Sequence, residues 1–262
     1  MTIISGRQDR PGQTLDPPPI AGEVPELLDI AVEAHGGLAR WNEVSSIKIN
    51  VSIGGAIWDV KGQPDVLKDI VMVADTQREL VTTSFVGQDR TAIFEPDQVV
   101  VVQQSDGTIL DSSDDPEASF EGQDADTPWN AIHVTYFSGE ALWTYLNTPF
   151  LYTQARFSKQ EIDAIEVQGE TWRRLRVIFP DDVKSHTREQ IFCFGPDGLL
   201  RRHDYSVDVL GGATGLNYAS DYREVDGLMF PTTRRVYAYE GDYQLVPEPL
   251  LVSVDIGQIT LS

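Results

Sequence analysis

The chain has 262 residues, of which 41% are hydrophobic, and this suits one large all-β domain or two small ones with a sizeable core. Its 41 acidic and 20 basic side chains give a formal net charge of −21 at pH 7. A field of that sign repels nucleic acid and anionic lipid headgroups, so the charge argues against a nucleic-acid function.

Cysteine and histidine usage limits the metal chemistry. The single cysteine, Cys193, allows no intrachain disulfide and no cysteine-rich metal site. The four histidines (His35, His133, His186 and His203) are scattered, without the short spacings of common metal motifs. We therefore expect no metal ion and no cofactor.

The N-terminal segment is different in composition from the rest of the chain. Residues 1–22 are rich in Pro and Gly and poor in apolar side chains, which predicts a flexible tail before a single domain over residues 23–262. This segment lacks the apolar run and cleavage site of a secretory signal, so the expected localisation is cytoplasmic. No stretch reaches the ~18 apolar residues of a membrane span, so we expect no transmembrane segment.

Helical periodicity comes first along the chain and then changes to a period of two. Residues 25–37 predict a helix that ends at a Gly pair, and residues 38–44 a further helical turn that points Trp41 and Val44 inward. From Ser46, alternate apolar residues predict a strand. Further strands are predicted at 66–74, 78–86, 90–95, 98–104 and 108–111, followed by an acidic, solvated loop.

An aromatic segment interrupts the β pattern at residues 127–148. Thr127–Pro128 predicts the start of one helix, and Ser138 can cap a second. The rings recur at helical spacing, and they either line a ligand pocket that faces the sheet or simply fill its interior. The candidate ligand-binding residues are Trp129, His133, Tyr136, Phe137 and Trp143.

After Thr148-Pro149 the β pattern returns and runs to the C-terminus. There is no βαβ alternation, phosphate-binding loop or dinucleotide fingerprint. We predict a mainly β (α+β) fold: a single curved antiparallel sheet that forms a half-barrel, with its concave face covered by helices.

The hairpin "GPDGLLRRHDY", residues 195–205, carries the candidate chemistry. Side chains alternate along a strand, so His203 and Tyr205 share a face and Asp204 points to the other. A bulged turn in which Gly195 pairs with Leu199 would place Glu189 opposite Tyr205, on the helix-covered side. The second face, with Arg202 and Asp204, is predicted to be mostly solvated.

Glu189, His203 and Tyr205 are therefore the candidate catalytic residues. A carboxylate can orient a histidine, and a tyrosine beside them can donate or accept a proton. A satisfied buried network is the more frequent explanation for such a trio, so both interpretations stay open.

The layout over residues 24–262 resembles the LolA/LppX-like half-barrel superfamily. The resemblance is carried by "AVEAHGGLARWNEVSSIKINVS" at residues 31–52, by the aromatic helical insert, and by "DGLLRRHDY" at residues 197–205. It implies a half-barrel fold and a role like that of the family's carriers of lipids and lipoproteins. A relative in fold, the violacein-pathway enzyme, implies that such a half-barrel can also carry out biosynthetic chemistry on an aromatic substrate.

Our first hypothesis is a protein that binds an apolar or aromatic small molecule, or a lipid, between the sheet and the helices. The alternative is a cofactor-independent biosynthetic enzyme of isomerase, cyclase or dehydratase type in the same cavity. A purely structural or interaction role is the third. The sequence sets no oligomeric state and is compatible with a homodimer.

Overall fold

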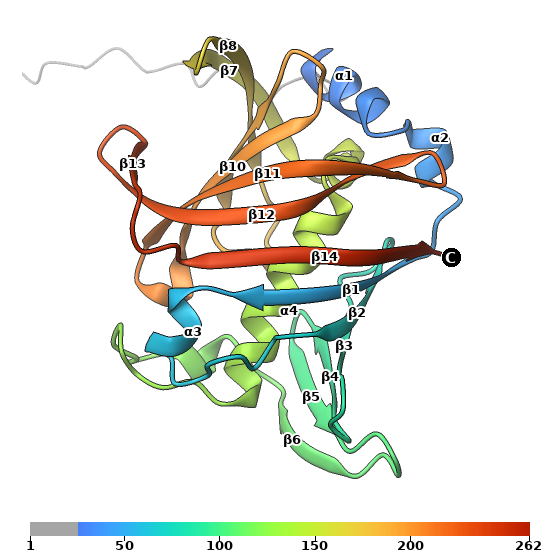
Figure 1. The fold of residues 1–262 in the computed structure, drawn as a ribbon, viewed down its shortest axis with the longest axis vertical. Coiled ribbons are helices and arrows are strands. Elements are labelled where there is room, and N and C mark those ends of the chain that lie inside the picture. Colours follow the sequence, from blue (N-terminus) through green and yellow to red (C-terminus); the bar gives the residue numbers. More distant parts are fainter. Residues whose placement is uncertain (1–25) are drawn as a thin grey trace, which may run out of the picture.

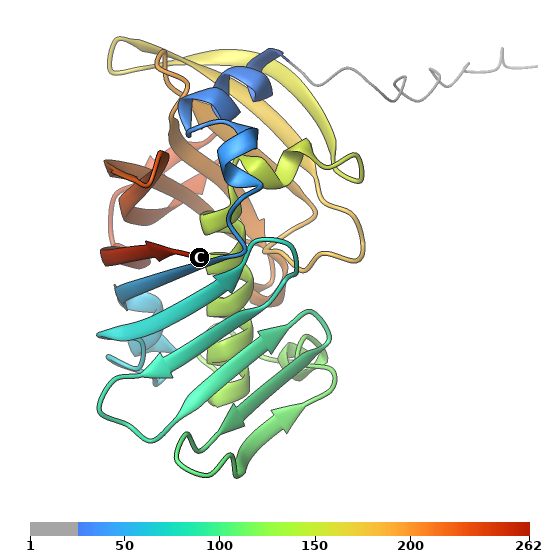
Figure 2. The ribbon, with the colours of Figure 1, turned by 90° about the vertical axis from the view of Figure 1, so that its right-hand side faces the viewer.

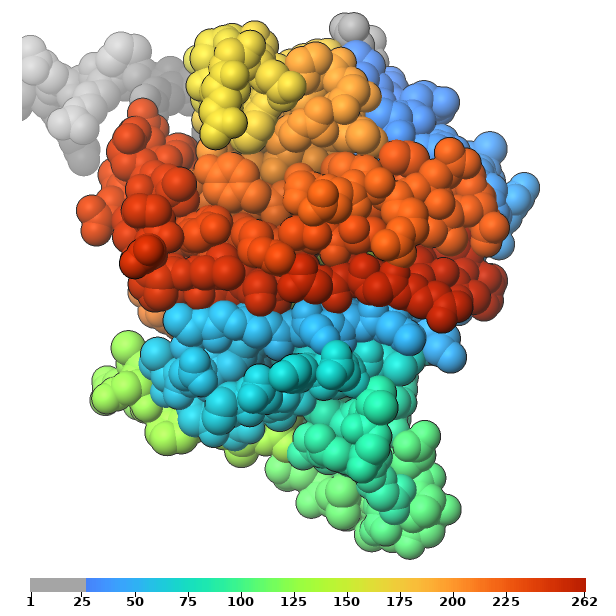
Figure 3. Space-filling view, viewed as in Figure 1, coloured from blue at the N-terminus to red at the C-terminus, as the bar shows by residue number. Residues whose placement is uncertain are grey.

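The period of two that begins at Ser46 builds the centre of a large sheet. In the computed structural model, which describes residues 26–262, β1 (Ser46–Gly54) buries Ile47, Ile49, Val51 and Ile53 on one face. β1 pairs antiparallel with β2 (Ile70–Asp75) and with the last strand, β14 (Val252–Leu261). The first and last strands are therefore neighbours, as the adjacent blue and red bands of Figure 3 show. The tail predicted at residues 1–22 lies outside the described residues.

The remaining strands extend this centre in both directions (Figure 1). Beyond β2 lie β3 (Val81–Phe85), β4 (Thr91–Glu95), β5 (Gln98–Val102) and β6 (Ile109–Ser113). Beyond β14 lie β12 (Leu228–Glu240), β11 (Ala213–Val225), β10 (Leu200–Val207), β9 (Glu189–Phe194), β8 (Glu170–Ile178) and β7 (Ser158–Val167), and β13 (Gln244–Val246) pairs with β12. All these pairings are antiparallel, and the end strands β6 and β7 are not paired with each other. The predicted fold class, one curved and open antiparallel sheet, is confirmed.

Helices cover the concave face of this sheet. α4 (Ala131–Asn147) runs along its length, and α1 (Glu26–Ala34) and α2 (Leu38–Trp41) lie at the end formed by β7–β10 (Figure 2). The remaining helical segments are α3 (Ala56–Val60), η1 (Ala118–Phe120), η2 (Phe150–Thr153) and η3 (Asp208–Leu210). α3, a five-residue helix, was not predicted from the sequence. Within residues 26–262 no helix is long and apolar enough to cross a membrane.

The predicted pair of helices at residues 127–148 is instead one continuous helix, α4. Its N-cap is Asn130, whose side chain accepts from the His133 N–H while the His133 ring accepts from the Asn130 N–H, both at 3.1 Å. Ser138 does not cap a second helix, because its hydroxyl donates to the Val134 carbonyl at 2.7 Å inside the first. Residues from Ile132 to Asn147 are all buried, and Glu140 is the one charged residue of this helix.

The hairpin between β9 and β10 forms as predicted at its turn but not in its register. Gly195 N–H donates to the Leu199 carbonyl at 2.9 Å, and Gly198 has the positive φ of 78° that the turn requires. A bulge between Leu200 and Arg202 then shifts the ladder by one residue. His203 lies opposite Phe192 instead of Ile191.

This shift corrects the placement of Glu189. Its side chain is 56% exposed and lies 4.0 Å from Arg176, so it is not beside His203 and Tyr205. His203, Tyr205 and Phe192 do point to the helix-covered side, as predicted for the first two.

Arg202 and Asp204 are on the opposite face, but this face is not solvated. They form a buried bidentate ion pair with distances of 2.6 and 2.8 Å, and the guanidinium lies between the rings of Trp172 and Tyr218. Cys193 belongs to this second, smaller apolar cluster. The prediction of a solvated face was wrong because aromatic side chains on the convex side cover the pair.

Candidate functional site

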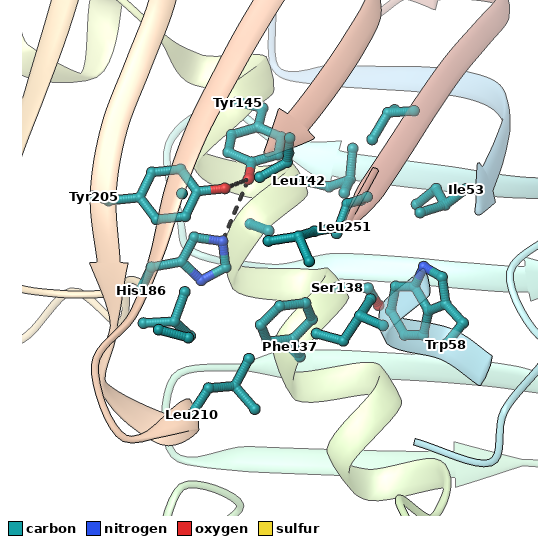
Figure 4. Close-up of a pocket in the computed structure, with 18 of the residues that line it drawn as sticks. Ile53, Trp58, Phe137, Ser138, Leu142, Tyr145, His186, Tyr205, Leu210 and Leu251 are labelled. Atoms are coloured by element: carbon teal, nitrogen blue, oxygen red, sulfur yellow. Dashed lines mark hydrogen bonds between the residues drawn. The ribbon is translucent and has the colours of Figure 1, made fainter. Parts of the chain in front are cut away.

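A cavity lies between α4 and the concave face of the sheet (Figure 4). Its volume is about 60 Å³. The polar side chains in its wall are Ser138, Tyr145, His186, Tyr205 and Thr214. The rest of the wall is apolar: Ile53, Ile57, Trp58, Phe137, Ala141, Leu142, Val207, Leu210, Ala213, Gly215, Val236, Leu251, Val252 and Val254.

The helical and strand periods explain why these side chains meet. α4 contributes residues 137, 138, 141, 142 and 145, which form one stripe along a helix. β1, β10, β11, β12 and β14 contribute inward-facing side chains across from that stripe. Gly215 leaves room for the Tyr205 ring, because a Cβ at this position would lie 2.6 Å from that ring.

Four buried polar side chains form a hydrogen-bonded chain at one side of the cavity. Glu140 Oε1 lies 2.8 Å from His186 Nδ1, His186 Nε2 lies 3.3 Å from the Tyr145 hydroxyl, and that hydroxyl lies 2.9 Å from the Tyr205 hydroxyl. An ionised Glu140 can only accept, so His186 carries its proton on Nδ1 and accepts from Tyr145 on Nε2. Tyr205 then donates to Tyr145, and this order satisfies each link of the chain.

Burial sets the protonation of the two phenols. Desolvation raises the pKa of Tyr145 to about 12 and the pKa of Tyr205 well above its usual value. Both are therefore neutral hydroxyls at physiological pH. They can anchor a ligand by hydrogen bonds.

His203 lies deeper than this chain. Its Nε2 is 2.5 Å from Gln190 Oε1, and its ring stacks on Phe192 with centroids 4.1 Å apart. Burial, and then the positive charge of Arg234, hold the pKa of His203 well below its usual value. His203 is thus a neutral, packed imidazole and is not among the residues that line the cavity.

Two of the residues selected from the sequence line the cavity: Phe137 and Tyr205. Trp129, which precedes α4, and His133 and Tyr136 on α4 pack around Phe120 of η1. Trp143 donates to the Asp75 carbonyl at 2.9 Å. Most of these rings therefore fill the interior of the half-barrel. The pocket predicted from them does not coincide with the cavity, which only Phe137 among them lines.

Sequence reasoning missed Glu140, His186 and Tyr145. Glu140 carried a usable signal, since a lone carboxylate in a helix that is otherwise apolar on all sides must be buried and must find a partner. His186 carried none, because it lies between β8 and β9 and reaches Glu140 only through the fold. Within residues 26–262, no group of three or more His, Cys, Asp or Glu side chains is placed to hold a metal ion.

No protein-family model matches the chain, and no curated protein does. Among solved structures, the chain is similar to a LolA superfamily protein from Nitrosomonas europaea, at 13% identity and a TM-score of 0.48. It is also similar to a domain assigned to outer membrane lipoprotein sorting from Vibrio parahaemolyticus (10%, 0.42) and to a DUF1329 family protein from Desulfovibrio piger (11%, 0.44). Each comparison covers 90% of this chain and 92% of the other. These similarities concern the fold alone.

Proposed function

We propose that this protein binds an apolar or aromatic small molecule, or a single lipid chain, in the cavity between α4 and the sheet. The observation that carries the proposal is the wall of that cavity, in which apolar side chains from five strands and three helical segments surround a few hydroxyl and imidazole groups. Ligand sites commonly combine such a wall with a small number of placed polar groups. Tyr205 and His186 supply those groups here.

The size of the cavity limits the ligand. At roughly 15 Å³ for each water, 60 Å³ holds about four waters. This is smaller than the roughly 150 Å³ of an engineered apolar cavity that binds benzene. A ligand therefore enters with one narrow alkyl chain and extends out through the opening, and a lipid with two chains does not fit. The exposed Ala213 and the half-buried Ile57 and Val252 place the opening between α3, the start of β14 and the segment after η3.

Direct binding tests the proposal. In isothermal titration calorimetry, the single-chain ligand 1-octanol should bind saturably. Ala141→Leu adds bulk inside the cavity and should weaken binding roughly tenfold or more, because overpacking leaves no room for the ligand. The control is Ala164→Leu on the exposed side of β7, which should bind like the parent. Absence of saturable binding, or equal binding in Ala141→Leu and the parent, would refute the proposal.

The runner-up is proton-transfer catalysis on a ligand in the same cavity. The chain Glu140–His186–Tyr145–Tyr205 supports it, because it links a carboxylate to a hydroxyl in the cavity wall. It ranks second because every link of this chain is already formed without any substrate, and one oxygen of Glu140, Oε2, alone has no partner. Protein-dependent exchange of a ligand's protons for deuterons in D₂O would distinguish catalysis from binding.

A further inference from the structure

Arg234 is a buried cation next to the cavity. It lies on the concave side of β12, is 2% exposed, and donates through Nη2 to the Tyr145 carbonyl at 3.3 Å. Its guanidinium carbon lies 4.5 Å from the centroid of the Tyr145 ring. Nη1 has no hydrogen-bond partner, and no carboxylate of residues 26–262 forms an ion pair with this guanidinium. A buried guanidinium in a native protein normally has an anionic or fully hydrogen-bonded partner.

Asn217 presents a second unsatisfied group on the neighbouring strand. It lies on β11 opposite Val236, so Arg234 is its diagonal neighbour on the same face, within reach of a long side chain. Asn217 is completely buried, and neither Oδ1 nor Nδ2 has a hydrogen-bond partner, although its amide lies near enough to the Tyr145 hydroxyl to offset part of the rise in the pKa of that phenol. Buried polar atoms without partners are rare enough that two adjacent side chains of this kind call for an explanation.

Both groups lie directly behind the cavity wall. Val236 lies opposite Asn217 and two residues from Arg234 on the same face, and it lines the cavity. Tyr145, whose ring covers the guanidinium, lines the cavity as well. Rotation of the Tyr145 ring would connect Arg234 and Asn217 with the cavity. The nearby Glu140 bonds to His186 through Oε1 and leaves Oε2 without a partner, but it forms no hydrogen bond or ion pair with Arg234. His203 is neutral, so neither residue supplies the missing partner.

We propose that Arg234 and Asn217 form a carboxylate-binding site at the inner end of the cavity, so that the ligand is a carboxylic acid with an apolar chain or ring. This inference rests on the proposed function of the cavity. The free Nη1 and Nδ2 donors match the two oxygens of a carboxylate. One buried positive charge balances a monoanion, whereas a phosphate dianion would remain partly uncompensated.

The test compares octanoic acid with 1-octanol and methyl octanoate, which share its chain but carry no charge. At pH 8 the acid is ionised, and in isothermal titration calorimetry it should bind the parent at least tenfold more tightly than the alcohol or the ester. Arg234→Met should abolish this preference and leave the affinity for octanol unchanged. Arg234→Lys, which keeps the charge but loses the planar fork, should retain part of the preference.

Arg235→Met is the matched control. Arg235 is the next residue on β12, but its guanidinium pairs with Asp255 at 2.7 Å on the solvent-exposed side. This variant should keep the full preference for octanoate. If the preference for octanoate over octanol survives in Arg234→Met, or is lost equally in Arg235→Met, the proposed carboxylate site is wrong.

The remaining outcomes separate this inference from the proposed function. Equal binding of octanoate and octanol to the parent overturns the carboxylate site but leaves the cavity as a site for neutral molecules. Thermal stabilisation by acetate without tighter binding of octanoate indicates a small-anion site unconnected to the cavity, and also overturns it. Failure of octanol to bind at all refutes the function itself.

Discussion

Glu79 is a buried carboxyl whose protonation state changes on folding. Its side chain is 9% exposed, Oε1 has no hydrogen-bond partner, and burial raises its pKa to about 9 although the Lys184 N–H donates to Oε2 at 3.0 Å. The folded protein therefore holds a proton that the unfolded chain, with a pKa near 4.5, releases. The contribution to stability is fully present below about pH 4.5 and is lost as the pH rises towards 9, by at most about 1.4 kcal/mol per pH unit.

Glu79→Gln should consequently be more stable than the parent at pH 8, and its advantage should shrink as the pH falls towards 5. The amide resembles the protonated acid in shape but has no proton to lose. Urea unfolding of both proteins between pH 5 and 9 measures the difference. Glu189→Gln, which changes an exposed carboxylate, should show no such trend. Parallel stability curves for Glu79→Gln and the parent would contradict the prediction.

Single residues also show how far a sequence can be interpreted. Strand alternation correctly placed His203 and Tyr205 inside and Asp204 outside. Glu189 was misplaced because the bulge at Arg201 shifts the ladder by one residue, and no residue type announces such a bulge. Arg234 could have been noticed, because neighbouring side chains of a strand point to opposite faces, so one member of the pair Arg234–Arg235 must point inward.

At the level of elements, Gly139 determines how α4 packs. A Cβ at this position would lie 2.4 Å from the ring of Phe94 on β4. Alanine normally stabilises a helix by about 1 kcal/mol over glycine. Here Gly139→Ala should instead destabilise the protein by roughly 1–3 kcal/mol, because neither the helix nor the ring can move without disturbing its neighbours. Denaturant unfolding measures the change.

A second substitution tests the cause. Phe94→Leu removes the ring, so Gly139→Ala should cost less in that background than in the parent. The double-mutant cycle isolates this coupling. If Gly139→Ala stabilises the parent, or costs the same in both backgrounds, the contact with Phe94 does not determine the packing of α4.

The same glycine explains why one helix was predicted as two. Ser138 and Gly139 together look like a helix break and a new cap in sequence. In the structure, Ser138 bonds back to Val134, and Gly139 allows close approach of the sheet. Both residues serve tertiary packing, which a local pattern does not contain.

For the whole molecule, the change of period at Ser46 and the return of β pattern after Pro149 were enough to predict one curved sheet with helices inside it. The position of the cavity could not be predicted. α4 is apolar on all sides, so its sequence does not distinguish the stripe that meets β1, β10–β12 and β14 from the rings that pack against β3–β6. That choice depends on how the strands curve around the helix.

The pairing of β1 with β14 at the centre of this sheet leads to a prediction for the domain as a whole. Because these strands join β2–β6 to β7–β12, and α4 packs inside, residues 26–262 should unfold as one cooperative unit. Cys193 reports on this, since it is the single cysteine and is completely buried on β9, many strands away from Phe94 on β4. Gly139→Ala should accelerate labelling of Cys193 by a thiol reagent by the same factor by which it raises the unfolding equilibrium constant, about tenfold for each 1.4 kcal/mol.

The comparison uses labelling slow enough for opening and closing to equilibrate, with Ala164→Leu as a variant expected to change neither quantity. If Gly139→Ala lowers the stability but Cys193 reacts at the parent's rate, the two sides of the sheet open independently, and the single domain predicted over residues 23–262 would have to be divided.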